Sequence, residues 1–134
     1  MTIEWKDNLA TGVNEIDAQH KELFKRINVL FEACSKRKGR AEVSNLMNFL
    51  EEYVVIHFNT EEKYMAMFNY PDYSSHKEEH TNFIRDFLYL KKQFETSNES
   101  LTLLKLNMKL VDWLRQHIGN VDKKFGVFLK NMKV

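Results

Sequence analysis

All five histidines of this chain belong to one spacing pattern that also contains two carboxylates. The pattern consists of His20, His57-x3-Glu61, His76-x3-His80 and His117-x4-Asp122. Imidazole nitrogens and carboxylate oxygens are groups with which proteins bind iron and zinc. Because an unpaired buried polar group costs roughly 1–3 kcal/mol, a set of this kind gathered in a protein interior needs a shared partner. The pattern therefore predicts a metal centre that uses every histidine of the chain.

Apolar residues recur at steps of three and four along four segments, and this periodicity is typical of amphipathic helices. The predicted helices span about 17–38, about 41–68, the stretch from Asp72 or Ser75 to a loop at 96–100, and a last one through Leu103 and Leu114. Gly39 and the turn around Pro71 separate the first three, and Ser75-x-x-Glu78 fits a capping box. Gly119-Asn120 is expected to end the fourth helix.

Helices of comparable length joined by short connections predict an all-α fold, an up-down-up-down antiparallel four-helix bundle. Residues 1–134 are expected to form one domain. The first dozen residues are predicted to be an N-terminal arm whose Trp5 packs on the bundle. A short C-terminal helix with Phe125, Phe128 and Leu129 should follow the fourth helix, although Gly126 weakens the helical pattern there.

The spacing of the polar residues decides which of them can reach one site. Side chains four residues apart lie on the same side of a helix, so His57 can act with Glu61, and His76 with His80. A step of five, as from His117 to Asp122, turns the second side chain roughly 140° away on a regular helix. We therefore expect the helix to stop after His117, near Gly119, so that the backbone carries Asp122 back towards the centre.

The number of donor atoms favours two metal ions. Five imidazole nitrogens and two carboxylates that each bridge give nine protein donors. One bridging solvent oxygen leaves two octahedral ions a single donor short, and such a mixed set with an open position suits non-haem iron. Zinc is the alternative, because residues 76–80 also match the H-x-x-E-H pattern of zinc peptidases. That chemistry would leave His20, His57 and His117 unused, and the Glu-x-x-His motif of ferritin-like diiron proteins is absent.

Composition excludes several other classes of function. The formal net charge is +1 with both signs scattered, so no nucleic-acid interface is expected. No segment has the apolar length that a membrane span requires, and the first residues lack the apolar stretch of a signal peptide. The single cysteine, Cys34, cannot form an internal disulfide. These features predict a cytoplasmic protein without membrane insertion.

In these residues and spacings the chain resembles the bacterial hemerythrins, over essentially its whole length and at every ligand position. The resemblance implies two iron ions (Fe2+/Fe3+) joined by a bridging oxo or hydroxo group. It implies that His76, His80 and His117 hold one iron, that His20 and His57 hold the other, and that Glu61 and Asp122 bridge them. Dioxygen is then expected to bind end-on to the two-histidine iron, to be held there as hydroperoxide, and to leave by the reverse steps.

Five apolar residues near the ligands in sequence resemble the family's pocket lining: Leu23, Phe58, Trp113, Leu114 and Ile118. Ordinary packing in the bundle core explains them equally well. The expected function is reversible dioxygen binding by a monomeric carrier or store that is not an enzyme and that serves an unknown oxygen-consuming acceptor. The alternatives are a diiron oxidase or peroxidase, and a module that senses oxygen or redox state.

Overall fold

The computed structural model describes residues 3–36, 39–97 and 100–132, and within these ranges the chain is helical and contains no strand. The helices are α1 (Asn14–Ser35), α2 (Arg40–Met67), α3 (Tyr73–Ser97), α4 (Ser100–Gln116) and α5 (Lys123–Met132). A short 3-10 turn, η1 (Asp7–Leu9), lies in the arm, and a π-helical turn, η2 (His117–Asp122), joins α4 to α5. None of the described helices is both long enough and apolar enough to cross a bilayer.

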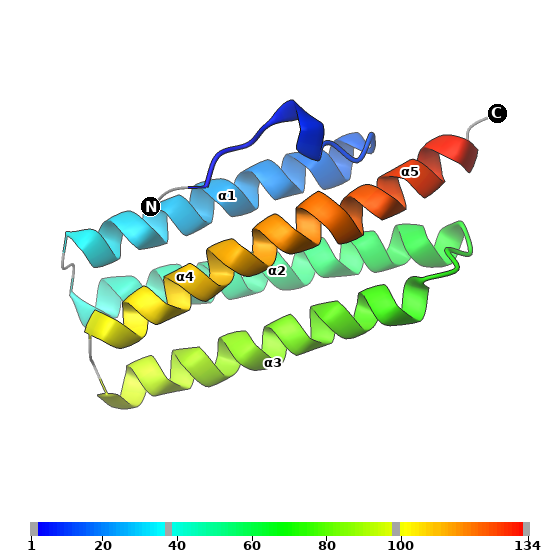
Figure 1. Cartoon of the computed structure of the whole chain (residues 1–134). Coiled ribbons are helices and arrows are strands. Elements are labelled where there is room, and N and C mark those ends of the chain that lie inside the picture. Colours follow the sequence, from blue (N-terminus) through cyan, green and yellow to red (C-terminus); the bar gives the residue numbers. More distant parts are fainter. Residues whose placement is uncertain (1–2, 37–38, 98–99, 133–134) are drawn as a thin grey trace.

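The four long helices form an antiparallel bundle (Figure 1). Each helix packs against the next one along the chain, and α1 also contacts α4, so the ring of helices is closed. This arrangement confirms the up-down-up-down fold class. Helix α5 continues the direction of α4, and the N-terminal arm lies along the outside of α1 (Figure 1).

The start of α1 differs from the predicted one. The helix begins at Asn14, three residues before Asp17. The Asp17 carboxylate accepts hydrogen bonds from the backbone N–H and the hydroxyl of Thr11, both at 2.8 Å. Asp17 therefore stabilises the corner between the arm and α1 from inside the first helical turn.

The turn between α2 and α3 stops α2 where the sequence predicts. Asn69 adopts a positive φ of 52°, a conformation in which asparagine commonly ends a helix. The N–H of Tyr70 donates to the carbonyl of Met65 at 2.9 Å, and the N–H of Asn69 donates to that of Ala66 at 3.3 Å. These two bonds form a Schellman motif, which turns the chain into α3.

Of the two predicted starts of α3, the structure has the earlier one, because the helix begins at Tyr73, directly after Asp72. Ser75 therefore lies inside the helix, where its hydroxyl donates to the carbonyl of Asp72 at 3.1 Å. The predicted end of this helix is wrong. Thr96 and Ser97 are not in a loop but form the last helical residues, where the Thr96 hydroxyl donates to the carbonyl of Lys92 at 3.1 Å. Ser100 already belongs to α4, and the remainder of the predicted loop lies outside the described residues.

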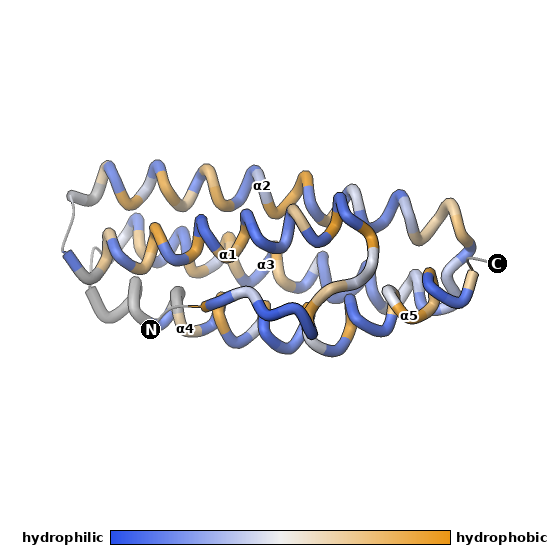
Figure 2. Tube along the Cα trace, turned by 90° about the horizontal axis from the view of Figure 1, so that it is seen from above, coloured by the Kyte–Doolittle hydropathy of each residue, from blue (hydrophilic) through white to orange (hydrophobic). Residues whose placement is uncertain are grey.

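The core consists of two apolar clusters with a buried polar layer between them. The larger cluster contains Leu23, Phe58, Phe83 and Leu114, and the smaller one contains Ile16, Met65, Tyr70, Phe125 and Leu129. Along α1 the order is Ile16, then His20, then Leu23, and α2 likewise places Glu61 between Phe58 and Met65. The helices therefore bring these polar residues to the same height in the bundle. Along the coloured parts of the helices, hydrophilic and hydrophobic stretches alternate from turn to turn, as amphipathic helices require (Figure 2).

Candidate metal centre

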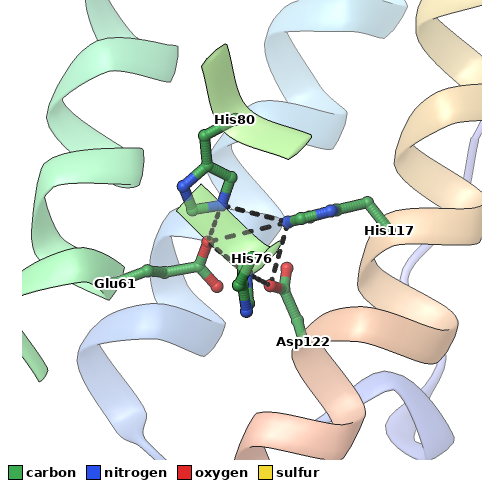
Figure 3. A group of neighbouring side chains, drawn as sticks. All are labelled: Glu61, His76, His80, His117 and Asp122. Atoms are coloured by element: carbon green, nitrogen blue, oxygen red, sulfur yellow. Dashed lines mark hydrogen bonds and ion pairs between the residues drawn. The ribbon is translucent and has the colours of Figure 1, made fainter. Parts of the chain in front are cut away.

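The structure gathers all seven predicted ligands in that polar layer, in two overlapping groups. Within each group, one potential ligand atom per residue lies within 4.8 Å of every other such atom. The first group consists of Glu61, His76, His80, His117 and Asp122, which point toward one another in Figure 3. The second group consists of His20, His57, Glu61 and Asp122. The three-histidine group and the two-histidine group thus share both carboxylates.

Each carboxylate lies between imidazoles of the two groups. Oδ2 of Asp122 is 2.9 Å from Nε2 of His20, while Oδ1 of Asp122 is 2.9 Å from Nε2 of His76. Oε1 of Glu61 is 3.1 Å from Nε2 of His80 and 3.4 Å from Nε2 of His57. Asp122 thus presents a different oxygen to each group, whereas Glu61 presents the same oxygen, Oε1, to both. Each carboxylate can therefore bridge two cations, one in each group.

The π-helical turn η2 explains how a step of five residues serves one site. The prediction that the fourth helix ends at Gly119-Asn120 is wrong, because the chain remains helical through η2 into α5. Hydrogen bonds in a π-helix join residues five apart, so His117 and Asp122 lie on the same side, one wide turn from each other. Their Nε2 and Oδ1 atoms are 3.1 Å apart. The unusual spacing in the sequence is thus the signature of this turn.

The buried polar atoms need a partner that the protein itself does not supply. Both ring nitrogens of His20 and His76, and both carboxylate oxygens of Glu61 and Asp122, are buried without a hydrogen bond of acceptable geometry. The relative exposure of each of these four residues is at most 2%. Native proteins satisfy almost all of their buried polar groups. A cation between the carboxylates would satisfy these atoms jointly.

The spacing of the ligand atoms fits such a cation. Metal–nitrogen bonds of roughly 2.0–2.1 Å place neighbouring ligands of an octahedral ion about 3 Å apart. Nε2 of His80 is 3.1 Å from Nε2 of His117, and Oδ1 of Asp122 is 2.9 Å from Nε2 of His76 and 3.1 Å from Nε2 of His117. The three-histidine group therefore has the separations expected of adjacent ligands on one ion.

The carboxylates control the protonation of the imidazoles. Burial lowers the pKa of His20, but the neighbouring carboxylates of Asp122 and Glu61 outweigh burial and raise this pKa to about 9. Burial also lowers the pKa of His117, but Asp122 and Glu61 outweigh burial and hold this pKa well above its usual value. Burial lowers the pKa of His57 to about 4. A cation that binds at the centre must therefore displace protons from some of the imidazoles.

Both carboxylates remain ionised at neutral pH. Burial raises the pKa of Glu61, but the charge of His57 and the contacts with His117 and His20 hold it well below its usual value. Burial and the charge of Glu61 raise the pKa of Asp122, but His117 and His20 outweigh both and lower it. The centre therefore offers two negative charges to a cation.

Three histidines also have partners on the outer side of the ring, at Nδ1. These partners are Gln19 for His57, Glu62 for His80 and Glu79 for His117, at 2.8, 3.0 and 3.2 Å respectively. None of these three partners was assigned to a histidine from the sequence. The Glu79 side chain is 41% exposed but still contacts His117. The one available signal was position, since each outer partner is adjacent in sequence to a ligand.

The five apolar residues predicted near the centre all belong to the larger core cluster or pack against it. Phe58 stacks on His80 with ring centroids 3.8 Å apart and an interplanar angle of 6°, and Trp113 stacks on His117 at 4.2 Å and 13°. Leu23, Leu114 and Ile118 are buried. Packing and lining of the site are thus compatible roles for these residues.

Trp5 lies closer to the centre than the sequence suggests. Its ring packs on α1, 6.5 Å from the ring of His20 and 6.1 Å from that of Phe24. Nζ of Lys21 lies 5.2 Å from the centroid of the indole. The expected packing of the arm on the bundle is confirmed, and this packing places the indole beside His20 of the two-histidine group.

Comparisons with known proteins agree with this geometry. A family model described as the hemerythrin HHE cation binding domain matches residues 11–129. A bacteriohemerythrin of Methylococcus capsulatus is 34% identical over 116 residues, which cover 87% of each chain. A hemerythrin-like protein of Naegleria gruberi is 35% identical over 121 residues, covering 90% of this chain and 88% of that one. A crystal structure of wild-type hemerythrin superposes with a TM-score of 0.85 at 31% identity, covering 94% of this chain and 96% of that one. The chain belongs to the hemerythrin family.

Proposed function

We propose that this chain binds dioxygen reversibly at a diiron centre, and that it acts as a carrier or store of dioxygen. The proposed ligands are His76, His80 and His117 for one iron and His20 and His57 for the other, with Glu61 and Asp122 shared. The observation that carries the proposal is the inequality of the two groups, which share both carboxylates but differ by one imidazole. The two-histidine group therefore leaves room for a ligand from outside the protein.

The charge of the donor set supports reversible binding. Two ferrous ions supply the two electrons that dioxygen takes on binding and returns on release. Two carboxylates and one hydroxide offset three of the four positive charges of such a pair, and the five imidazoles are neutral donors. The resting centre then keeps about one net positive charge, whereas centres richer in carboxylate favour higher oxidation states. The small number of carboxylates is thus appropriate to a carrier.

The apolar surroundings have the second task, which is to exclude water. If water and protons reached the open position, the bound oxygen would leave in a form other than dioxygen. Leu23, Phe58, Leu114 and Ile118 are each at most 2% exposed. We assign these four side chains, with Trp113, to the lining of the site, and we assign Trp5 to its outer cover.

The test is a cycle of oxygenation. The metal-free protein is loaded with ferrous iron under argon, exposed to air and then purged, while the charge-transfer absorption is followed. We expect two irons per chain and full return to the colourless form over several cycles. The same protein loaded with zinc is the control, since it has the ligands occupied but cannot transfer electrons.

Three outcomes would overturn the proposal. One iron per chain would exclude the diiron centre. Multiple turnovers that consume a reductant and peroxide would identify an oxidase or peroxidase instead. A conformational response to oxygen, without release of dioxygen on purging, would identify the sensory function.

The proposed carrier is a cytoplasmic monomer that passes dioxygen to an oxygen-consuming acceptor. The lone Cys34, which has no second cysteine to pair with, suits a reducing compartment. Sedimentation of the iron-loaded protein at increasing concentration tests the monomer, and a mass that doubles over the range would contradict it.

A further inference from the structure

The outer partners of the histidines follow a rule of position. Gln19 on α1 contacts His57 on α2, Glu62 on α2 contacts His80 on α3, and Glu79 on α3 contacts His117, which follows α4. Each outer partner is adjacent in sequence to a ligand of its own helix. Neighbouring residues point about 100° apart around a helix, so a ligand directed inward leaves the next side chain directed at the adjacent helix. Successive helices are thus linked through the ligands themselves.

The direction of the Gln19 amide follows from its neighbours. The Thr60 hydroxyl donates its one hydrogen to the carbonyl of Ile56 at 3.0 Å. It can therefore only accept from the Gln19 side chain, whose Nε2 lies 3.1 Å away. The amide oxygen of Gln19 is left facing Nδ1 of His57 at 2.8 Å. His57 must carry its proton on Nδ1, which leaves the lone pair of Nε2 for a metal.

The two remaining outer partners are carboxylates, and both belong to the three-histidine group. Oε2 of Glu62 is 3.0 Å from Nδ1 of His80, and the Glu62 side chain is only 18% exposed. Oε1 of Glu79 is 3.2 Å from Nδ1 of His117. An ionised carboxylate can only accept, so both imidazoles donate from Nδ1 and present Nε2 to the centre. Among the residues that the structure describes, the two-histidine group has one outer partner, and that partner is a neutral amide.

A charged acceptor and a neutral one act differently on a metal ligand. A carboxylate that accepts the Nδ1 proton makes the imidazole a more basic ligand, and removal of such a partner typically weakens metal binding about 10–100-fold. We propose that Glu62 and Glu79 are positioning residues that strengthen metal binding at the three-histidine group, while Gln19 leaves the two-histidine group the weaker site. This inference rests on the two-metal centre of the proposed function. It adds that the protein sets the inequality of the two sites through residues that touch no metal.

The test is a stepwise metal titration of the metal-free protein with ferrous iron under argon, against a competing chelator. The variants are Glu62→Gln, Glu79→Gln and Gln19→Glu. We expect each of the first two to weaken the tighter binding step about tenfold or more and to change the weaker step less. Gln19→Glu should do the opposite, strengthening the weaker step about tenfold, with Thr60 reorienting its hydroxyl.

Glu78→Gln is the matched control. Glu78 is exposed on α3 beside Glu79, so this variant removes the same charge without removing an outer partner. We expect less than about a threefold change in either step, because exposed charges are screened. An effect of Glu78→Gln as large as that of Glu79→Gln would overturn the inference, since overall charge would then explain both.

A second measurement separates positioning from general damage to the fold. In the diamagnetic zinc-loaded protein, nuclear magnetic resonance should detect slowly exchanging Nδ1 protons on His57, His80 and His117. Glu79→Gln should shift the His117 resonance and leave that of His57 in place. If the protein bound only one zinc ion per chain, the two-metal centre on which both proposals rest would be excluded. Two ions per chain with unchanged stepwise constants in all three variants would overturn this inference alone.

Discussion

Replacement of Gly119 by alanine distinguishes two ways in which Asp122 can reach the centre. If the helix ended at Gly119, the glycine would adopt the left-handed conformation of a helix C-terminus, and alanine there would lose about 1 kcal/mol or more. In the structure the chain passes helically from α4 through η2 to α5, and Gly119 has no positive φ. The two accounts therefore predict stability changes of opposite sign.

The magnitude follows from the space around the glycine. A Cβ atom at position 119 would lie 3.9 Å from Cδ2 of Leu9, which is an ordinary van der Waals contact. Glycine inside a helix costs about 0.5–1 kcal/mol relative to alanine. We expect Gly119→Ala to stabilise the protein by that amount, which raises the melting temperature by roughly 2–5 °C for a domain of this size.

Gly126→Ala is the matched control within the same helical run. A Cβ atom there would lie 2.5 Å from the backbone oxygen of Thr11 and 2.8 Å from its Cα, so the arm or α5 must shift. Overpacking of this kind destabilises a protein by about 1–3 kcal/mol, which exceeds the stabilisation that alanine gives a helix relative to glycine. The close packing of α5 on the arm thus accounts for a glycine at position 126, the residue that weakened the prediction of a helix there.

The assay is denaturant unfolding of both metal-free variants, followed by circular dichroism, together with the iron content after reconstitution. Gly119→Ala should be more stable than the parent protein and should keep the same iron content, whereas Gly126→Ala should be less stable. A destabilised Gly119→Ala that has also lost iron would refute the continuous helix and restore the predicted helix end.

Three further predictions concern the centre. Iron binding at pH 7 should release protons, because the pKa of His20 is about 9 before a cation displaces its proton, and iron affinity should therefore increase with pH up to about that value. Calorimetry in buffers of different ionisation enthalpy measures the release, and an absence of released protons would contradict this protonation state. Asp122→Asn should reduce iron to one ion per chain or fewer, because His20, His76 and His117 lose their shared anionic partner; elemental analysis that still finds two ions would exclude Asp122 as a bridge. Trp5→Ala should keep the iron but accelerate irreversible oxidation severalfold in stopped air-exposure assays, since the indole covers His20; an unchanged rate would limit Trp5 to packing.

The bundle was predictable because its helices carry their apolar residues at regular steps. The stripes through Leu23 and Ile27 on α1 and through Phe83 and Phe87 on α3 are buried in the structure. The same periodicity placed His57 with Glu61 and His76 with His80. Burial of one helix face provides the main driving force for such a fold, and this term depends on the pattern more than on the individual residues.

Local signals at the helix ends were less informative. Ser75 and Glu78 match a capping box, yet α3 begins at Tyr73, directly after Asp72, which was the other predicted start and which follows the Schellman turn at Asn69 and Tyr70. A cap contributes only about 1 kcal/mol, so packing of the adjoining turn can override it. The π turn at Gly119 was not predicted because local sequence signals do not favour it. Its wider geometry is unfavourable by itself, and it occurs together with the contact of His117 and Asp122 inside the bundle.

The sequence by itself determines which side chains are available as ligands and, for all of them except Asp122, on which face of its helix each lies, because residue type and periodicity are properties of the chain alone. Only the tertiary structure decides which helices face one another and at what rotation. That rotation pairs Gln19 with His57, Glu62 with His80 and Glu79 with His117. It also makes Glu61 and Asp122 common to both groups of histidines. These contacts join residues of different helices at about 3 Å, and a distance of that kind depends on the packing of the whole bundle.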